Sequence, residues 1–278
     1  MNVVPTAKLT HREQIARSRR DKVASSSRIV QPVARALALL GAFTPSDRWL
    51  TNSELVLRTG LPASTVFRLT KCLVTLGYLR YSAERRRYCL CATVLALGYA
   101  AIVQSSVQRV VQERMVDFCE QYRTHLILSR RERLNLIVIE TCSSRAAGTS
   151  LKFTVGECLD LASTPMGWAL LAVLPEAERY CLLGSIEQRS PRDWPRLRRC
   201  SIEAISQVLN VGYCLSLCEW NPKLAIIATP LLIDGYAPLV LTCVGAASQV
   251  SRARVERELG PKLTSIAAAI AKEVIVPQ

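Results

Sequence analysis

The spacing of apolar residues over the first hundred positions predicts three helices followed by a β-hairpin. Beyond Gln31, hydrophobic side chains recur at helical intervals at Val33, Leu37, Leu40 and Phe43. Gly41 together with Pro45 ends this run. We expect the first helix to pack along this apolar stripe.

The next two predicted helices are separated by a short glycine turn. Thr51 and Glu54 form a capping box, which predicts a helix from Asn52 to about Thr59, closed by Gly60. Pro62 is suited to the first turn of a third helix, which Gly77 ends. Its apolar stripe is Val66, Leu69, Leu73 and Leu76, and its other face carries Ser64, Arg68, Lys71 and Thr75.

A basic hairpin is expected after the third helix. Tyr78–Tyr81 and Tyr88–Leu90 have the composition of short strands, and the connecting SAERRR places Arg85, Arg86 and Arg87 at the tip. A helix pair joined by a glycine turn, with a polar and basic second helix, is the geometry that enters the DNA major groove. The alternative is an ordinary surface helix, but the adjacent basic hairpin favours a DNA-binding wing.

The charge distribution supports that interpretation. The formal net charge is +14, and residues 1–90 hold 16 basic against 5 acidic residues, a net charge of +11. A concentrated positive field attracts a polyanion such as double-stranded DNA. Residues 1–28 hold few large apolar side chains, so we expect a disordered basic arm that serves either solubility or additional phosphate contacts.

Cysteine and hydropathy patterns narrow the class of protein further. The 11 cysteines include no Cys-x-x-Cys pair and the chain has only 2 histidines, so we expect buried reduced thiols, no metal site and no cofactor. The N-terminus lacks an apolar signal core, which predicts a cytoplasmic protein. The apolar run from Cys89 to Val103 is too short for a membrane span and is expected to be a buried helix.

These motifs closely resemble the IclR family of bacterial transcription regulators. The resemblance rests on VARALALLGAF, LTNSELVLRTGLPASTVFRLTKCLVTLGYLRY and RRRYCLCATVLALG, and spans about Val30 to Gly98. It continues more loosely through VGECLDLASTPMGWALLAVLPEAER, VGYCLSLCEWNPKLAIIATPL and LVLTCVGAAS, in the order of the family's effector-binding domain.

The resemblance implies an α+β protein with three structured parts. These are a winged helix-turn-helix at residues 29–90, a linker helix at 91–106, and a GAF-like α/β effector-binding domain on a curved antiparallel sheet at 107–278. Within the last part, Val107–Tyr122 is expected to be the first helix, LILSRRERLNLIVIE a hairpin and Tyr236–Val244 a strand.

The candidate DNA-binding residues lie on the third helix and the wing. Arg68 can form a bidentate pair with guanine, Phe67 can touch a thymine methyl group, and hydroxyls can bond bases or phosphates. Ala63 departs from the family, which commonly has a basic residue there. The full candidate set is Ser64, Thr65, Phe67, Arg68, Lys71, Arg85, Arg86 and Arg87.

Two segments supply the candidate effector site. One is the expected helix N-terminus at Thr164, Pro165, Met166 and Gly167, which either binds a carboxylate or is merely capped. The resemblance implies further pocket positions at Ser216, Ile226, Thr242 and Val244. Because two of these four are aliphatic, a larger, more apolar organic acid, such as an aromatic acid, fits better than glyoxylate or pyruvate.

An enzyme is not expected, because two histidines and the absence of a GxGxxG or P-loop motif provide no catalytic set. Glu219 is the most tempting acid and is interpreted as orienting a loop or ligand. The alternative function is a ligand-independent DNA-binding repressor or architectural protein. The run ATVLALGYAAIV is apolar nearly all round, which predicts a homodimer or a dimer of dimers, unless this helix packs on its own wing.

Overall fold

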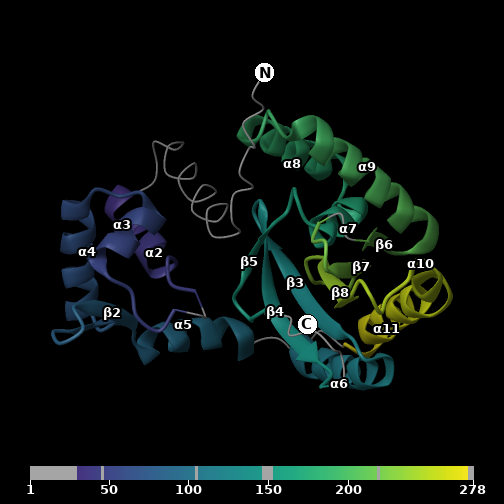
Figure 1. The fold of residues 1–278 in the computed structure, drawn as a ribbon, viewed down its shortest axis with the longest axis horizontal. Coiled ribbons are helices and arrows are strands. Elements are labelled where there is room, and N and C mark those ends of the chain that lie inside the picture. The colour runs from purple at the N-terminus through teal and green to yellow at the C-terminus, as the bar shows by residue number, and fades with distance from the viewer. Residues whose placement is uncertain (1–29, 45–46, 104–105, 146–152, 218–219, 275–278) are drawn as a thin grey trace. The chain divides into compact units, whose positions relative to one another are not determined.

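The computed structural model of the chain describes residues 30–44, 47–103, 106–145, 153–217 and 220–274 (Figure 1). The chain forms two compact units that divide between Val103 and Gln104. The expected basic arm at residues 1–28 and Glu219 lie outside the described residues.

The first unit contains a small helical core followed by a hairpin and one further helix. In chain order its elements are α2 (Gln31–Leu40), α3 (Asn52–Thr59), α4 (Ala63–Thr75), β1 (Leu79–Ser82), β2 (Arg87–Leu90) and α5 (Ala92–Val103). The antiparallel hairpin gains a third strand-like partner, because Leu50 pairs with Tyr88 through two backbone hydrogen bonds of 2.9 and 2.7 Å. The predicted winged helix-turn-helix is thereby confirmed.

The residues that form the core of this unit differ in part from the apolar stripes expected from the sequence. Leu39, Leu55, Val66 and Leu73 are buried together. Val33 and Leu37 were expected on the packed face of α2, but the structure exposes them, at 56% and 62%. Leu76 at the end of α4 is also exposed.

The reason for this error is the broad apolar surface of α2. Eight of the ten residues of QPVARALALL are apolar, so the apolar side is wide and periodicity alone does not determine which part of it meets α3 and α4. The contacts of the tertiary structure select Leu39 instead.

Helix α5 was expected to be buried, but its described side chains, up to Gly98, are mostly exposed in the single chain. Leu95 and Leu97 are 71% and 60% exposed, although the helix is strongly apolar. None of the described helices is both long and apolar enough to cross a bilayer.

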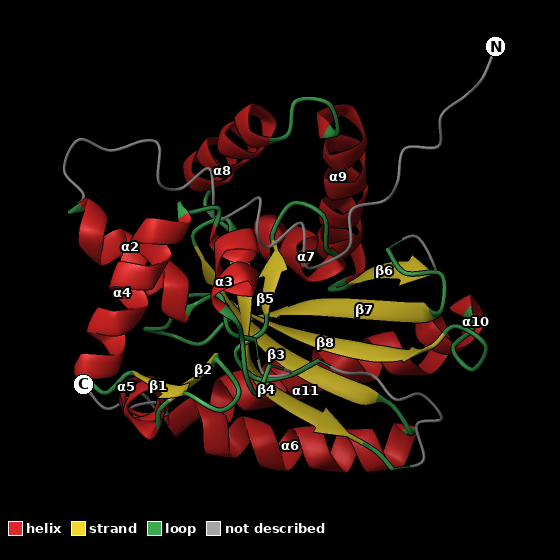
Figure 2. Cartoon of the chain, turned by 60° about the vertical axis from the view of Figure 1, so that its left-hand side comes forward, coloured by secondary structure: helices red, strands yellow, loops and turns green. Residues whose placement is uncertain are grey.

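The second unit is a six-stranded antiparallel sheet with helices on both faces (Figure 2). The strand order is β5-β4-β3-β8-β7-β6. Its strands are β3 (His125–Glu132), β4 (Asn135–Ser143), β5 (Cys158–Asp160), β6 (Cys214–Leu217), β7 (Leu224–Leu231) and β8 (Leu239–Ala246). Its helices are α6 (Ser106–Tyr122), α7 (Pro165–Val173), α8 (Glu176–Arg189), α9 (Trp194–Val211), α10 (Arg252–Arg254), the π-helical turn η1 (Val255–Leu259) and α11 (Gly260–Glu273).

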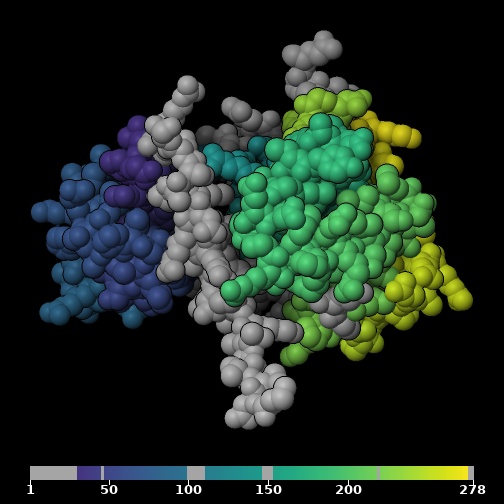
Figure 3. Space-filling view, turned by 90° about the horizontal axis from the view of Figure 1, so that it is seen from above, coloured from purple at the N-terminus to yellow at the C-terminus, as the bar shows by residue number. Residues whose placement is uncertain are grey.

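Alternation along each strand divides the hydrophobic core into two layers. Leu126, Ile227 and Cys243 point toward α6 and α11. Ile127, Ile226 and Val244 point the opposite way, toward α7, α8 and α9. The outer surfaces of α8 and α9 form much of the green area in Figure 3. The α+β class predicted from the sequence is confirmed.

The sheet ends at the short strand β6. A side chain of α9 covers part of this edge, because the Leu215 backbone N–H donates to Gln207 Oε1 at 2.9 Å. Gln207 therefore replaces a neighbouring strand at this position.

The described cysteines are all free thiols, and they differ in exposure. Cys119 and Cys243 are buried between the sheet and α6, and burial raises the pKa of both thiols, so they stay protonated. The expectation of burial is wrong for Cys72 and Cys181, which are exposed on helix surfaces.

Candidate DNA-binding surface and effector site

The helix pair α3–α4 is held by local contacts that its sequence encodes. Thr51 Oγ1 accepts a hydrogen bond from the Glu54 backbone N–H at 3.2 Å, and the Thr51 N–H donates to Glu54 Oε2 at 2.8 Å. These bonds from Thr51, with smaller contributions from Arg87 and Arg58, lower the pKa of Glu54. Gly60, at φ 69°, then makes the left-handed turn into α4.

An ion pair fixes the segment that precedes α3. Arg58 donates from both terminal nitrogens to the Asp47 carboxylate, and Nη1 also donates to the Ala42 carbonyl at 3.0 Å. The Thr44 N–H donates to the same carboxylate at 2.9 Å. Hydrogen bonding by Arg58 is the main reason that the pKa of Asp47 lies far below its usual range. Asp47 therefore anchors the chain just before Trp49 and Leu50.

The outward face of α4 carries the predicted DNA-reading residues. Ser64, Phe67, Arg68 and Lys71 are exposed, and Thr65 is half-buried. Buried Val66 and Leu73 hold the opposite side of the helix against the core. The helix thus presents hydroxyl, aromatic and basic groups together to solvent, which suits a mixture of base and phosphate contacts.

The wing presents its arginines in a tight turn. Arg85, Arg86 and Arg87 are all exposed. Arg86 adopts φ 51°, and the Arg85 N–H donates to Ser82 Oγ at 3.2 Å. The sequence analysis did not include Trp49 and Arg80 among the wing residues, because their proximity to Arg85 depends on strand pairing.

The N-terminus of α7 is capped from within the chain. Thr164 Oγ1 accepts from the Gly167 N–H at 3.2 Å and donates to the Asp160 carbonyl at 2.8 Å. The Trp168 N–H bonds the Thr164 carbonyl, and Pro165 has no N–H. Of residues 165–168, at most the Met166 N–H is therefore open to an acceptor from outside the chain.

The same turn is packed too tightly for any side chain at Gly167. A Cβ atom there would lie 1.9 Å from the Leu161 carbonyl oxygen. Pro165 and Met166 are buried beside it. This glycine therefore sets how closely α7 approaches the segment that follows β5.

The four predicted sheet positions share the face that α7 covers. Ser216, Ile226 and Val244 occupy one row across β6, β7 and β8, and Thr242 lies in the neighbouring row beside Ala228. All four are at most 1% exposed. Ser216 Oγ and Thr242 Oγ1 are buried without a hydrogen-bond partner in the described chain. Such unbonded hydroxyls are uncommon in protein interiors and require an explanation.

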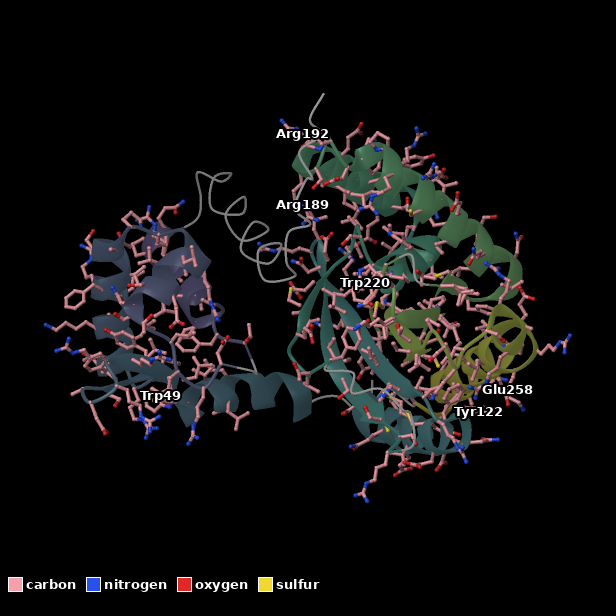
Figure 4. All side chains as sticks on the ribbon, in the orientation of Figure 1. Trp49, Tyr122, Arg189, Arg192, Trp220 and Glu258 are labelled. Carbon is pink, nitrogen blue, oxygen red and sulfur yellow. The ribbon has the colours of Figure 1, made fainter. Side chains whose placement is uncertain are left out.

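An aromatic pair that sequence reasoning missed packs against the same layer. The rings of Phe153 and Trp220 stack with centroids 6.2 Å apart and an interplanar angle of 21°. Both are partly buried against the hydrophobic layer under α7, and Figure 4 labels Trp220. Phe153 follows β4 and Trp220 precedes β7, so the pair joins connections from distant parts of the sheet. Among the described residues, no group of three or more His, Cys, Asp or Glu side chains could hold a metal ion.

The first unit is a DNA-binding helix-turn-helix domain, and comparison with known proteins defines its class. The model of the IclR helix-turn-helix domain matches residues 32–83. The regulator TsaQ1/TsaQ2 of Comamonas testosteroni is 26% identical over 90% of this chain and 90% of its own.

Solved structures extend the likeness to both units. An IclR family transcriptional regulator from Brucella abortus is 33% identical, covers 89% of this chain and 94% of its own, and superposes with a TM-score of 0.77. An IclR homologue from Microbacterium hydrocarbonoxydans, solved with 4-hydroxybenzoate, is 21% identical over 87% of this chain and all (100%) of its own, with a TM-score of 0.65. This protein belongs to the IclR family and is a transcriptional regulator.

Proposed function

We propose that this regulator reads a specific DNA site with α4 and that a small organic acid bound under α7 controls it. On α4, Arg68 pairs with a guanine edge, Phe67 contacts a thymine methyl group, and Ser64 and Thr65 bond bases or phosphates. The exposure of Ser64, Phe67 and Arg68, with Thr65 half-buried beside them, supports this assignment.

Positive charge on Lys71 and on the wing supplies the phosphate contacts. Arg85, Arg86 and Arg87 are exposed at the tip of the hairpin, next to the helix that enters the groove. Such contacts position the protein and make binding salt-dependent without reading sequence.

The observation that carries the effector proposal is the pair of unbonded hydroxyls of Ser216 and Thr242. Leaving a buried hydroxyl unbonded costs about 1 to 3 kcal/mol, and a ligand with polar atoms at these points removes that cost. Ile226, Val244 and Ala228 supply the apolar surface between them. Thr164, Pro165, Met166 and Gly167 border the same layer, and the Met166 amide can donate to a carboxylate.

The separation of the two hydroxyls favours an extended, largely apolar ligand. Ser216 and Thr242 are two strands and two residues apart, which places their Cα atoms about 12 Å from each other. An aromatic acid with polar groups at opposite ends fits this spacing better than a two-carbon acid. The homologue solved with 4-hydroxybenzoate supports an acid of this chemical class.

Thermal unfolding with added 4-hydroxybenzoate, benzoate or glyoxylate tests the proposal. At one hundred times its dissociation constant, a ligand stabilises by about 2.7 kcal/mol, which raises the midpoint by several degrees. Thr242→Val should leave the free protein equally or more stable, since it removes an unbonded hydroxyl, and should abolish the shift.

Thr229→Val is the matched control on the opposite face of the same sheet. Its hydroxyl donates to the Gly212 carbonyl at 2.8 Å, so this change should destabilise the free protein and leave the ligand shift intact. If no acid shifts wild-type unfolding while the protein still binds DNA, it is a ligand-independent repressor or architectural factor instead.

We also propose that the protein is at least a homodimer, joined in part through α5. Exposed Leu95 and Leu97 on a strongly apolar helix are the support, because a second copy would cover them. Light scattering of wild type and of Leu95→Asp should show loss of mass in the variant. A monomeric wild type, or a folded variant of unchanged mass, would contradict this.

A further inference from the structure

Two arginines of the wing lie over one indole ring. The guanidinium carbons of Arg80 and Arg85 are 5.5 and 5.4 Å from the ring centroid of Trp49. Figure 4 labels Trp49, which lies at the hairpin end of the first unit, where nitrogen atoms gather. This cluster of Trp49, Arg80 and Arg85 is called the wing platform below.

Strand pairing explains why the three residues meet. Leu50 pairs antiparallel with Tyr88, which sets Trp49 alongside Cys89, and Cys89 pairs with Arg80. The indole and the Arg80 side chain therefore share one face of the hairpin. Tyr81 and Tyr88 contact each other on the opposite face as a tilted pair, with centroids 4.9 Å apart and an interplanar angle of 43°.

The backbone at Trp49 is held on both sides. Two residues before Trp49, the Asp47 carboxylate accepts hydrogen bonds from Arg58. One residue after Trp49, Leu50 forms two backbone hydrogen bonds to β2. Trp49 Nε1 is buried and donates to no described acceptor. The ring position therefore depends on packing and on the strand bridge, and not on the indole N–H.

The two guanidinium groups concentrate unneutralised charge. They lie at most about 11 Å apart, because both are within 5.5 Å of one point, and this is comparable with a Debye length of about 8 to 10 Å. Neither forms an ion pair with a described carboxylate. An aromatic face attracts a guanidinium and leaves its N–H edge free for an anion.

We propose that Trp49 is a positioning residue that holds Arg80 and Arg85 for contact with phosphates of the DNA backbone, so that Arg80 belongs to the DNA-binding surface. The inference rests on the proposed phosphate contact of the wing. Arg86 provides an internal control, because it is exposed on the same turn and, among the described residues, lies over no aromatic ring.

The test measures the affinity of the full-length protein for a fluorescein-labelled random 30-base-pair duplex at several salt concentrations. Arg80→Ala and Arg85→Ala should each make the negative slope of log affinity against log salt shallower by about 0.9. Trp49→Leu should weaken binding about three- to tenfold, whereas Trp49→Phe, which keeps an aromatic face, should stay within about twofold.

Double variants distinguish the positioning of Arg80 and Arg85 by Trp49 from a general loss of folding. Trp49→Leu should add little in an Arg80→Ala, Arg85→Ala background, but should have its full effect in an Arg86→Ala background. Equal effects of Trp49→Leu in both backgrounds, or wild-type binding by Trp49→Leu, would overturn the proposal. If neither Arg85→Ala nor Arg86→Ala changes the salt slope, the wing contact itself is wrong, which is a separate failure.

Discussion

The polar groups on the surface of α4 and those under α7 differ in their solvation. On α4 and the wing, Arg68, Lys71 and the turn arginines lie in water, where a polyanion can replace solvent. Under α7, the hydroxyls of Ser216 and Thr242 are already removed from water and have no bond in the described chain. If the proposed sites are correct, binding at the first surface should depend strongly on salt, whereas binding at the second should depend on desolvation and hardly on salt.

The largest expected effect tests how rigidly the site under α7 is built. Gly167→Ala places a Cβ atom against the Leu161 carbonyl oxygen, so we expect a loss of about 3 kcal/mol in unfolding free energy. Gly184→Ala in α8, where no atom lies within 4 Å, should be neutral or stabilising by up to about 1 kcal/mol. Urea unfolding compares the two. Equal stability of Gly167→Ala and wild type would show that α7 can move.

A smaller loss is expected at the anchor of the DNA-binding unit. Asp47→Asn removes the charge that accepts from Arg58 and should cost about 2 kcal/mol. Because the folded pKa of Asp47 lies far below its unfolded value of 3.8, its stabilisation is complete well above pH 3.8, begins to decline below it, and disappears only as pH falls through the folded pKa.

Thermal unfolding from pH 7 to pH 3 checks this sign. The advantage of the wild type over Asp47→Asn should be constant from pH 7 to about pH 5 and should shrink, without vanishing, by pH 3. Glu258→Gln is the control, because its pair with Arg254 is more exposed and should contribute less than about 1 kcal/mol. An advantage of the same size at pH 7 and at pH 3 would contradict the role of Asp47.

The smallest expected effect distinguishes contacts with DNA bases from contacts with phosphates on α4. Arg68→Ala should weaken binding to an operator selected from genomic DNA by about 1 to 2 kcal/mol, and binding to random duplex by less. Lys71→Ala should weaken both to the same extent, because phosphate contacts do not depend on sequence. Equal losses for Arg68→Ala on the two DNAs would place Arg68 among the phosphate contacts.

Local signals allowed most of the first unit to be predicted. The Thr51–Glu54 capping box and Gly60 determine α3 and its turn within a few residues, without help from distant parts of the chain. The buried face of α2 was not predictable in the same way, because its apolar side is wide and the contacts with α3 and α4 decide which of its residues are buried.

The candidate sites depend even more on tertiary contacts that the sequence does not reveal. The family resemblance indicated the four sheet positions of the candidate site. It could not predict that the hydroxyls of Ser216 and Thr242 lack a hydrogen bond, because this depends on which groups pack over each hydroxyl. Trp49 with Arg80, and Phe153 with Trp220, meet only through strand pairing or long connections. No spacing in the sequence encodes such contacts.

The bond from Leu215 to Gln207 has a consequence for solubility and assembly. An open sheet edge offers unpaired N–H groups to the edge of another molecule, and head-to-tail pairing of this kind grows into fibres. By accepting from β6, the glutamine side chain occupies a donor that a foreign strand would need. This contact therefore works against open-ended polymerisation at this edge of the sheet, whatever number of copies the regulator assembles.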